Sequence, residues 1–171
     1  MTNVTLTQAD AREPQTHRAV RRTSFALARW TTAAWGALHV LGGALLLTTT
    51  LRGGPRETLL DLGSAADLEA IPSEPGSVVE AVLGFHALNI VWFGLAALIL
   101  AWRGTRTAVR DGLFVMAAAD VGLVLFMVGP GQMRPVEGIW GPLLLVIATA
   151  AFLWSRRHPE RPAPASESYA R

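Results

Sequence analysis

The feature that most constrains this chain is the run of residues 78–102, which is almost entirely apolar. About 20 helical residues cross the roughly 30 Å of hydrocarbon in a bilayer, so a run of this length predicts a membrane-spanning helix. Similar runs cover residues 30–51, 112–128 and 139–154. We therefore predict an all-α integral membrane protein with four transmembrane helices.

The composition supports this class. Of the 171 residues, 51% are hydrophobic and only 16% are charged, which is more apolar than an ordinary soluble domain. The chain has no cysteine, which excludes disulfides, thiolate metal sites and thiol redox chemistry. All 15 basic residues are arginine, so a Schiff-base lysine and a P-loop are excluded as well.

The arginines predict the orientation of the spans. Twelve of the 15 lie in the N-terminal segment, in the loop between the second and third runs, and in the C-terminal tail. The positive-inside rule then places both termini in the cytoplasm, and the short connections predict an up-down antiparallel bundle. Because the arginines flank spans and do not alternate with aromatics, we expect no nucleic-acid partner. The expected location is the cell membrane, as a multi-pass protein of a bacterial plasma membrane.

The domain organisation follows from these runs. We predict a flexible cytoplasmic tail over residues 1–28, a membrane domain over 29–155 and a disordered cytoplasmic tail over 156–171. Residues 52–77 form the extracytoplasmic loop between the first two spans.

The start of this loop and the start of the second span carry local signals. The sequence from Arg52 to Pro55, Arg-Gly-Gly-Pro, predicts a helix stop, and Pro55 suits the first turn of a short following helix. Apolar residues then recur at helical spacing: Leu59, Leu62, Ala66 and Ala70. Ser77 and Glu80 have the spacing of a capping box, which predicts that Glu80 serves the start of the second span.

Polar side chains lie close to the centres of three different spans. They are His39, Asn89 and Asp120, and His86 lies one turn from Asn89 on the same helix face. An acid at the centre of a span costs about 2.5–3.5 kcal/mol on insertion scales. Asp120 should therefore face inward, where it either pairs with a histidine or stays protonated. We predict a polar cluster in an apolar interior, with Asp120, His86 and His39 as candidate catalytic residues.

Large side chains are predicted to surround this cluster. Met116 shares a helix face with Asp120, and Trp35 lies one turn from His39. Trp92 and Phe93 follow Asn89 and are expected to project into the core. An apolar cavity with a few polar groups is the usual form of a small-molecule site. The candidate substrate-binding residues are Asn89, Trp35, Trp92, Phe93, Met116 and Glu80, and neither a metal nor a cofactor is predicted.

Two functions stay open. The preferred one is a membrane-embedded isomerase or cyclase of an isoprenoid-type substrate, with Asp120 as general acid and a histidine as its partner or base. Aromatic walls would then stabilise a carbocation. The alternative is a non-catalytic subunit that binds a quinone or another lipid.

Other interpretations are weaker. Haem ligation by His39 and His86 is disfavoured because the two histidines differ in depth by about a turn. A proton-coupled transporter is disfavoured because the chain shows no internal repeat. The polar residues also have a purely structural interpretation, as hydrogen bonds between helices worth about 0.6–2 kcal/mol each. A homodimer through small residues such as Ala118 and Gly122 is a further alternative.

Overall fold

The structure is a computed structural model that describes residues 9–62, 69 and 76–157. These residues form helices and turns, with no strand among them, so the all-α prediction is confirmed for the described ranges. The elements are α1 (Ala9–Asp61), α2 (Val78–Arg103), α3 (Arg106–Leu123), the π-helical turn η2 (Val124–Val128), α4 (Pro135–Gly138) and α5 (Trp140–Arg157). The remaining parts of the predicted loop and of both tails lie outside the described residues.

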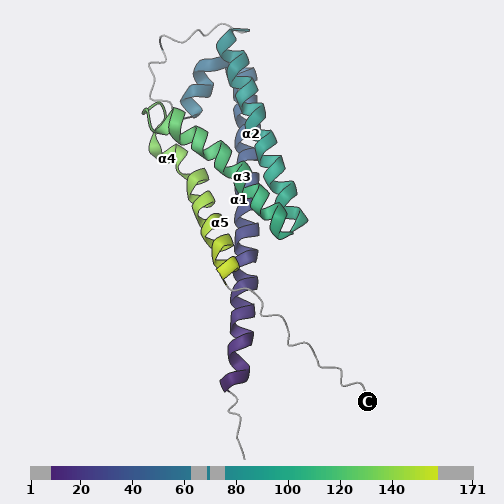
Figure 1. Ribbon diagram of the computed structural model, residues 1–171. Coiled ribbons are helices and arrows are strands. Elements are labelled where there is room, and N and C mark those ends of the chain that lie inside the picture. Colours follow the sequence, from purple (N-terminus) through teal and green to yellow (C-terminus); the bar gives the residue numbers. More distant parts are fainter. Residues whose placement is uncertain (1–8, 63–68, 70–75, 158–171) are drawn as a thin grey trace, which may run out of the picture.

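The helix α1 begins at Ala9, well before the predicted first span. In Figure 1 its first turns extend past the ends of the other helices. Residues 9–35 contain no glycine and many alanines and arginines, which favour a helix, and the flexibility of residues 1–28 stays a prediction. Helical propensity therefore carries the helix through a polar segment.

A sharp break divides α1 at Gly54, whose φ of +77° and ψ of −175° are not helical. Glycine accepts this φ without the steric cost of a side chain, and Pro55 restarts the helix. Thr58 Oγ1 donates to the Gly54 carbonyl (2.8 Å) and lies 3.1 Å from Thr50 Oγ1. The segment after Gly54 thus folds back against the helix before it. The predicted stop and short helix are confirmed as far as Asp61, whereas Ala66 and Ala70 lie outside the described residues.

The helices α1 and α2 pack with their backbones almost in contact. A Cβ added at Gly36 would lie 2.7 Å from the Gly94 carbonyl oxygen, and one added at Gly94 would lie 2.7 Å from that of Gly36. Farther along, a Cβ at Gly43 would lie 2.9 Å from the Ala87 carbonyl oxygen. Small residues at a helix interface permit this close approach. Because the contacts advance along α1 while they recede along α2, the two helices are antiparallel.

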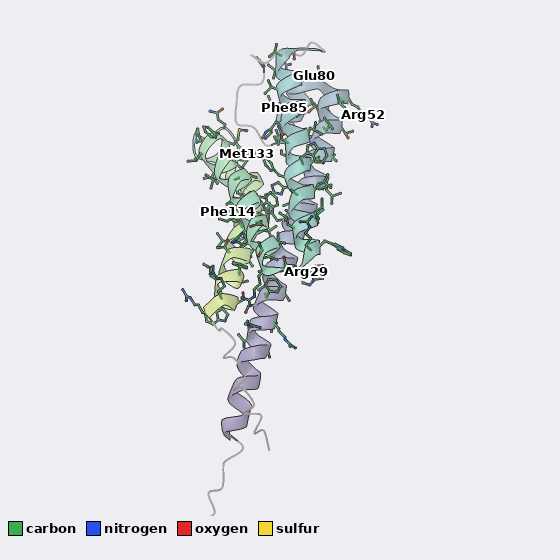
Figure 2. The ribbon with its side chains drawn as sticks, turned by 45° about the vertical axis from the view of Figure 1, so that its right-hand side comes forward. Arg29, Arg52, Glu80, Phe85, Phe114 and Met133 are labelled. Atoms are coloured by element: carbon green, nitrogen blue, oxygen red, sulfur yellow. The ribbon has the colours of Figure 1, made fainter. Side chains whose placement is uncertain are left out.

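Arginines bind the carbonyl ends of two helices. Arg29 Nε donates to the Ala101 carbonyl (2.8 Å) in the last turn of α2, where carbonyls lack partners within the helix. Arg106 Nη2 donates to the Ser155 carbonyl (3.4 Å) near the end of α5. Figure 2 shows Arg29 and Glu80 at opposite ends of the α1–α2 pair. These arginines, predicted as topology signals, therefore also hold helices together.

Three helical segments are long and apolar enough to cross a membrane. Within the described ranges they are residues 19–61 of α1, the helix α2, and residues 106–128, which combine α3 and η2. The helix α5 is shorter and ends in Arg156 and Arg157, and it does not meet the same criterion. Only 17–28% of the residues in each apolar window are buried, so most of this apolar surface faces outward. The prediction of four spans is thus supported for three of them.

Candidate functional site

Asp120 is buried where α1, α3 and α5 meet. Its exposed fraction is 2%, and it belongs to the inner face of α3, on which Val109, Leu113 and Met116 are buried at helical spacing. The apolar core beside it comprises Ala28, Trp35, Ala97, Val109, Leu113, Met116, Ala148, Ala151 and Phe152. The predicted inward position of Asp120 and Met116 is therefore what the structure shows.

One side of the Asp120 carboxyl group is hydrogen-bonded and the other is not. Trp35 Nε1 donates to Asp120 Oδ2 at 3.0 Å. Oδ1 is fully buried and has no hydrogen-bond partner in the described part of the chain. Buried polar atoms in native proteins nearly always have partners, so an unpaired one requires a structural or functional explanation.

His39 joins this group through Trp35. The two rings are stacked, with centroids 3.6 Å apart and an interplanar angle of 21°. His39 Nδ1 lies 2.9 Å from the Trp35 carbonyl oxygen. Because a carbonyl oxygen only accepts, Nδ1 carries the hydrogen, and this bond leaves Nε2 uncommitted as an acceptor or a proton carrier.

Gly141 on α5 is the fourth residue at this place, beside Asp120, Trp35 and His39. A Cβ at this position would lie 2.5 Å from Asp120 Oδ1 and 3.5 Å from His39 Cε1. The unpaired oxygen and the edge of the His39 ring therefore approach the same point of the α5 backbone, and a glycine there leaves both in place. We call Asp120, Trp35, His39 and Gly141 the Asp120 cluster. Gly141 was missed in the sequence because a glycine before a proline at a helix start indicates only a turn.

The other predicted site residues of the second span lie on the outside of α2. Trp92 and Phe93 have exposed fractions of 61% and 40%, His86 is exposed and Asn89 is half-buried. The expectation that Trp92 and Phe93 project into the core is therefore wrong. The reason is packing, because the face of α2 toward α1 is made of small residues that allow close backbone contact: Ala87, Gly94, Ala97 and Ala101.

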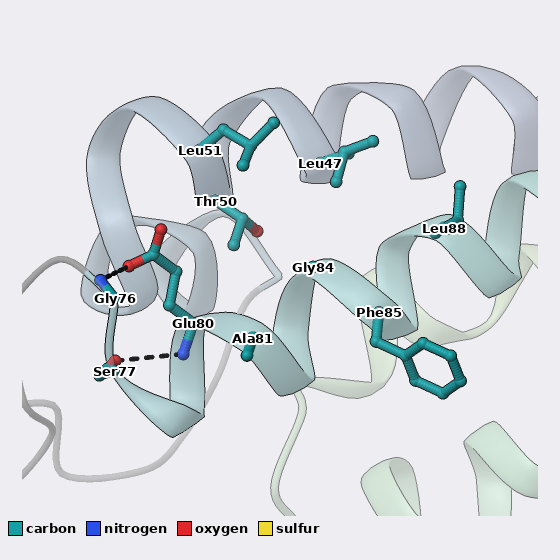
Figure 3. A pocket seen from close by; sticks show the side chains of 10 residues that line it. All are labelled: Leu47, Thr50, Leu51, Gly76, Ser77, Glu80, Ala81, Gly84, Phe85 and Leu88. Atoms are coloured by element: carbon teal, nitrogen blue, oxygen red, sulfur yellow. Dashed lines mark hydrogen bonds between the residues drawn. The ribbon is translucent and has the colours of Figure 1, made fainter.

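Glu80 lies in a separate place, at the start of α2. Its Oε2 accepts from the Gly76 amide (2.7 Å), and its own amide donates to Ser77 Oγ (3.2 Å), as Figure 3 shows. This is the predicted capping box with one bond displaced, because Glu80 reaches the amide of Gly76 and not that of Ser77. The role of Glu80 at the helix start is confirmed, and its role in substrate binding stays a prediction.

A pocket of about 370 Å³ lies beside Glu80, between α1 and α2. Its walls are mainly apolar and include Leu47, Leu51, Phe85 and Leu88 (Figure 3). Leu47 follows His39 by eight residues along α1, which corresponds to about 12 Å of helix. The pocket and the Asp120 cluster are therefore two distinct places in the fold.

Among the described residues, no group of three His, Asp or Glu side chains is arranged to hold a metal ion. In comparisons with known proteins, no family model, no curated protein and no solved structure matches this chain.

Proposed function

We propose that this chain is an integral protein of the cell membrane, a four-span up-down bundle that holds a lipophilic small molecule against the Asp120 cluster. Three helical segments have the length and hydropathy of spans, and most of the residues in their apolar windows are not buried. The fourth span in this proposal is α5, because Arg156 and Arg157 end it close to Arg106, at the arginine-rich end of the molecule.

The observation that carries the proposal is the unpaired, buried Oδ1 of Asp120. In its preferred form the chain is an isomerase or cyclase, and Asp120 gives a proton from Oδ1 to a carbon of an isoprenoid-type substrate. Trp35 Nε1 holds the carboxyl group through Oδ2. A proton lost from another carbon of the substrate returns to the carboxylate, directly or through His39 Nε2, so the protein regains its starting state.

The positions of the aromatic side chains bear on which reaction is proposed. Trp92 and Phe93 face outward, and one face of Trp35 is covered by His39, so of these three aromatic side chains only the other face of Trp35 is left to stabilise a carbocation. A proton shift within a double-bond system needs less of such stabilisation than a long cyclisation. Isomerisation is therefore the form that the geometry favours.

Non-catalytic binding of a quinone or another lipid is the second candidate. It is favoured by the pocket beside Glu80, which is mainly apolar and whose one acid already caps a helix. The head of a molecule bound there would lie about two turns of α1 away from the Asp120 cluster.

The test is mass spectrometry of the organic extract from the detergent-purified protein, compared with the variant Asp120→Asn. Asp111→Asn is the matched control, because Asp111 lies on the same helix but its side chain is 45% exposed and paired with Arg110 at 2.9 Å. We expect an isoprenoid enriched with the wild type and with Asp111→Asn. A different molecule on Asp120→Asn would indicate catalysis, and the same molecule in a smaller amount would indicate binding at the cluster.

Two further outcomes count against the preferred form. The same molecule in the same amount on all three proteins would place the ligand away from Asp120 and favour the pocket beside Glu80. Bulk phospholipid alone on all three would remove the support for a lipophilic ligand at either place.

A further inference from the structure

The helix α2 has a second regular face, directed away from α1. Residues on this face recur at alternating spacings of three and four: Val82, Phe85, Asn89, Trp92, Ala96 and Ile99. The large apolar members have exposed fractions from 56% to 67%, and Asn89 and Ala96 are partly exposed. Figure 3 shows Phe85 pointing away from α1. We call these six residues the α2 seam, since their spacing is the heptad pattern by which helices pack in coiled coils.

Asn89 is the polar member of the α2 seam, and it lies near the middle of the helix. Within the described ranges its side chain makes no hydrogen bond, and the same is true of His86, which is exposed at the border of the seam. An amide that meets only hydrocarbon leaves both its donor and its acceptor groups unpaired, which is costly. Apolar members of the seam could face lipid without penalty, whereas Asn89 requires a polar partner at its own depth.

We propose that the α2 seam is the interface of a homodimer, in which two α2 helices pack in parallel and the two Asn89 side chains pair. All copies of the chain insert with the same orientation, because the arginines set it. The two-fold axis of a symmetric dimer then runs along the membrane normal, and each residue on the axis meets its own counterpart. A second copy therefore supplies an amide at the depth of Asn89.

The chemistry of the side chain fits this partner. An Asn amide both donates and accepts, so two copies are complementary to each other across a two-fold axis. A single Asn within a heptad seam is also a known means of setting the register between helices. The alternative face on α3 lacks such a group. Ala118 and Val121 are exposed and apolar and Gly122 has open space around it, whereas Asp120, which lies between them in the sequence, is buried. The inference rests on the proposed membrane insertion but not on the chemistry of Asp120.

Cysteine cross-linking in membranes tests this interface. The chain has no native cysteine, so one introduced cysteine reports only its own position. Single cysteines at Phe85, Trp92 and Ala96 are compared after mild oxidation with cysteines at Leu41 on α1 and Ala118 on α3, which are exposed outside the seam. We expect disulfide-linked dimers for the seam positions only. Equal yields at all positions, dimers through Ala118 alone, or no dimers would overturn the proposal.

The role of Asn89 has a separate readout. We expect Asn89→Leu to raise the dimer dissociation constant in detergent by about 3- to 30-fold, measured by analytical ultracentrifugation, because an interhelical hydrogen bond is lost. Asn89→Gln retains an amide and is the control for general damage. A dimer of Asn89→Leu as tight as that of the wild type would contradict the pairing.

Membrane fractionation of the same cells separates this inference from the proposed function. A chain that stays out of the membrane fraction overturns both proposals. A chain in the membrane fraction that gives no seam-specific dimer overturns only the dimer.

Discussion

The environment of the buried Asp120 carboxyl group depends on a single residue, Gly141 on α5. The backbone of α5 comes so close to Asp120 Oδ1 that a side chain at position 141 would meet it, and Trp35 satisfies only the opposite oxygen. A purely structural acid is expected to have both oxygens paired, because each unpaired buried polar group costs about 1–3 kcal/mol. The absence of a partner for Oδ1, beside the hydrogen bond to Oδ2, is therefore the observation at this scale that supports the proposed function.

The Trp35–Asp120 hydrogen bond can be tested by a double-mutant cycle. Trp35→Phe removes the donor and leaves Oδ2 unpaired, so we expect a loss of about 1–3 kcal/mol in the free energy of unfolding in detergent. In the background of Asp120→Leu the same substitution should cost less, by a coupling of about 0.5–3 kcal/mol. Trp102→Phe, at an exposed tryptophan, is the control. Equal losses in both backgrounds would mean that the hydrogen bond contributes nothing measurable.

At the scale of helices, the size of the side chains decides how α2 is rotated. The helix is apolar nearly all round, so hydropathy alone does not indicate which face turns inward. The small residues turn toward α1 because two helices of this kind gain dispersion contacts and weak hydrogen bonds only at short range. Trp92 and Phe93 are turned outward as a consequence.

Two glycines of α1 give a matched comparison for this packing. Gly36→Ala places a Cβ 2.7 Å from the Gly94 carbonyl oxygen, and we expect a loss of about 1–3 kcal/mol in the free energy of unfolding. A Cβ at Gly42 meets nothing within 4 Å, so Gly42→Ala should be neutral or stabilise the helix by up to about 1 kcal/mol. Chemical denaturation in detergent measures both. If both variants were destabilised alike, close α1–α2 contact would not be the cause.

At the scale of the whole molecule, α1 is the element on which the others assemble. It contacts α2 through glycines, α3 through Trp35 and Asp120, and α5 at Gly141. Arg29 and Arg106 bind carbonyls in the last turns of α2 and α5, and Figure 2 shows Arg29 at the opposite end of α2 from Arg52 and Glu80. This separation supports the proposed orientation across the membrane.

That orientation predicts the labelling of single cysteines. Thr107 is exposed in the first turn of α3, next to the connection from α2, and Gln132 is exposed in the connection that follows η2. A membrane-impermeant maleimide should label Gln132→Cys in intact cells and Thr107→Cys only after permeabilisation, because the proposed orientation places the arginine-rich connection in the cytoplasm. Labelling of Thr107→Cys in intact cells would reverse the orientation, and labelling of both would contradict a span between them.

The sequence by itself determined the features that depend on neighbours along the chain. The helical class follows from the length of the apolar runs, the Gly54 break from glycine's access to positive φ, and the start of α2 from the side chains of Ser77 and Glu80. The sequence also places Asp120 and His39 near the middle of their apolar runs, because this needs only a count of residues from each end. Each of these needs only local geometry and hydrophobicity.

Only the tertiary structure decided which polar residues meet. It brought Asp120 to Trp35, His39 and the unforeseen Gly141, and it left His86 and Asn89 on an outer face. Depth is set by counting residues, but rotation about a helix axis is set by packing against neighbours. In a helix that is apolar on every side, that rotation depends on where small residues allow two backbones to touch.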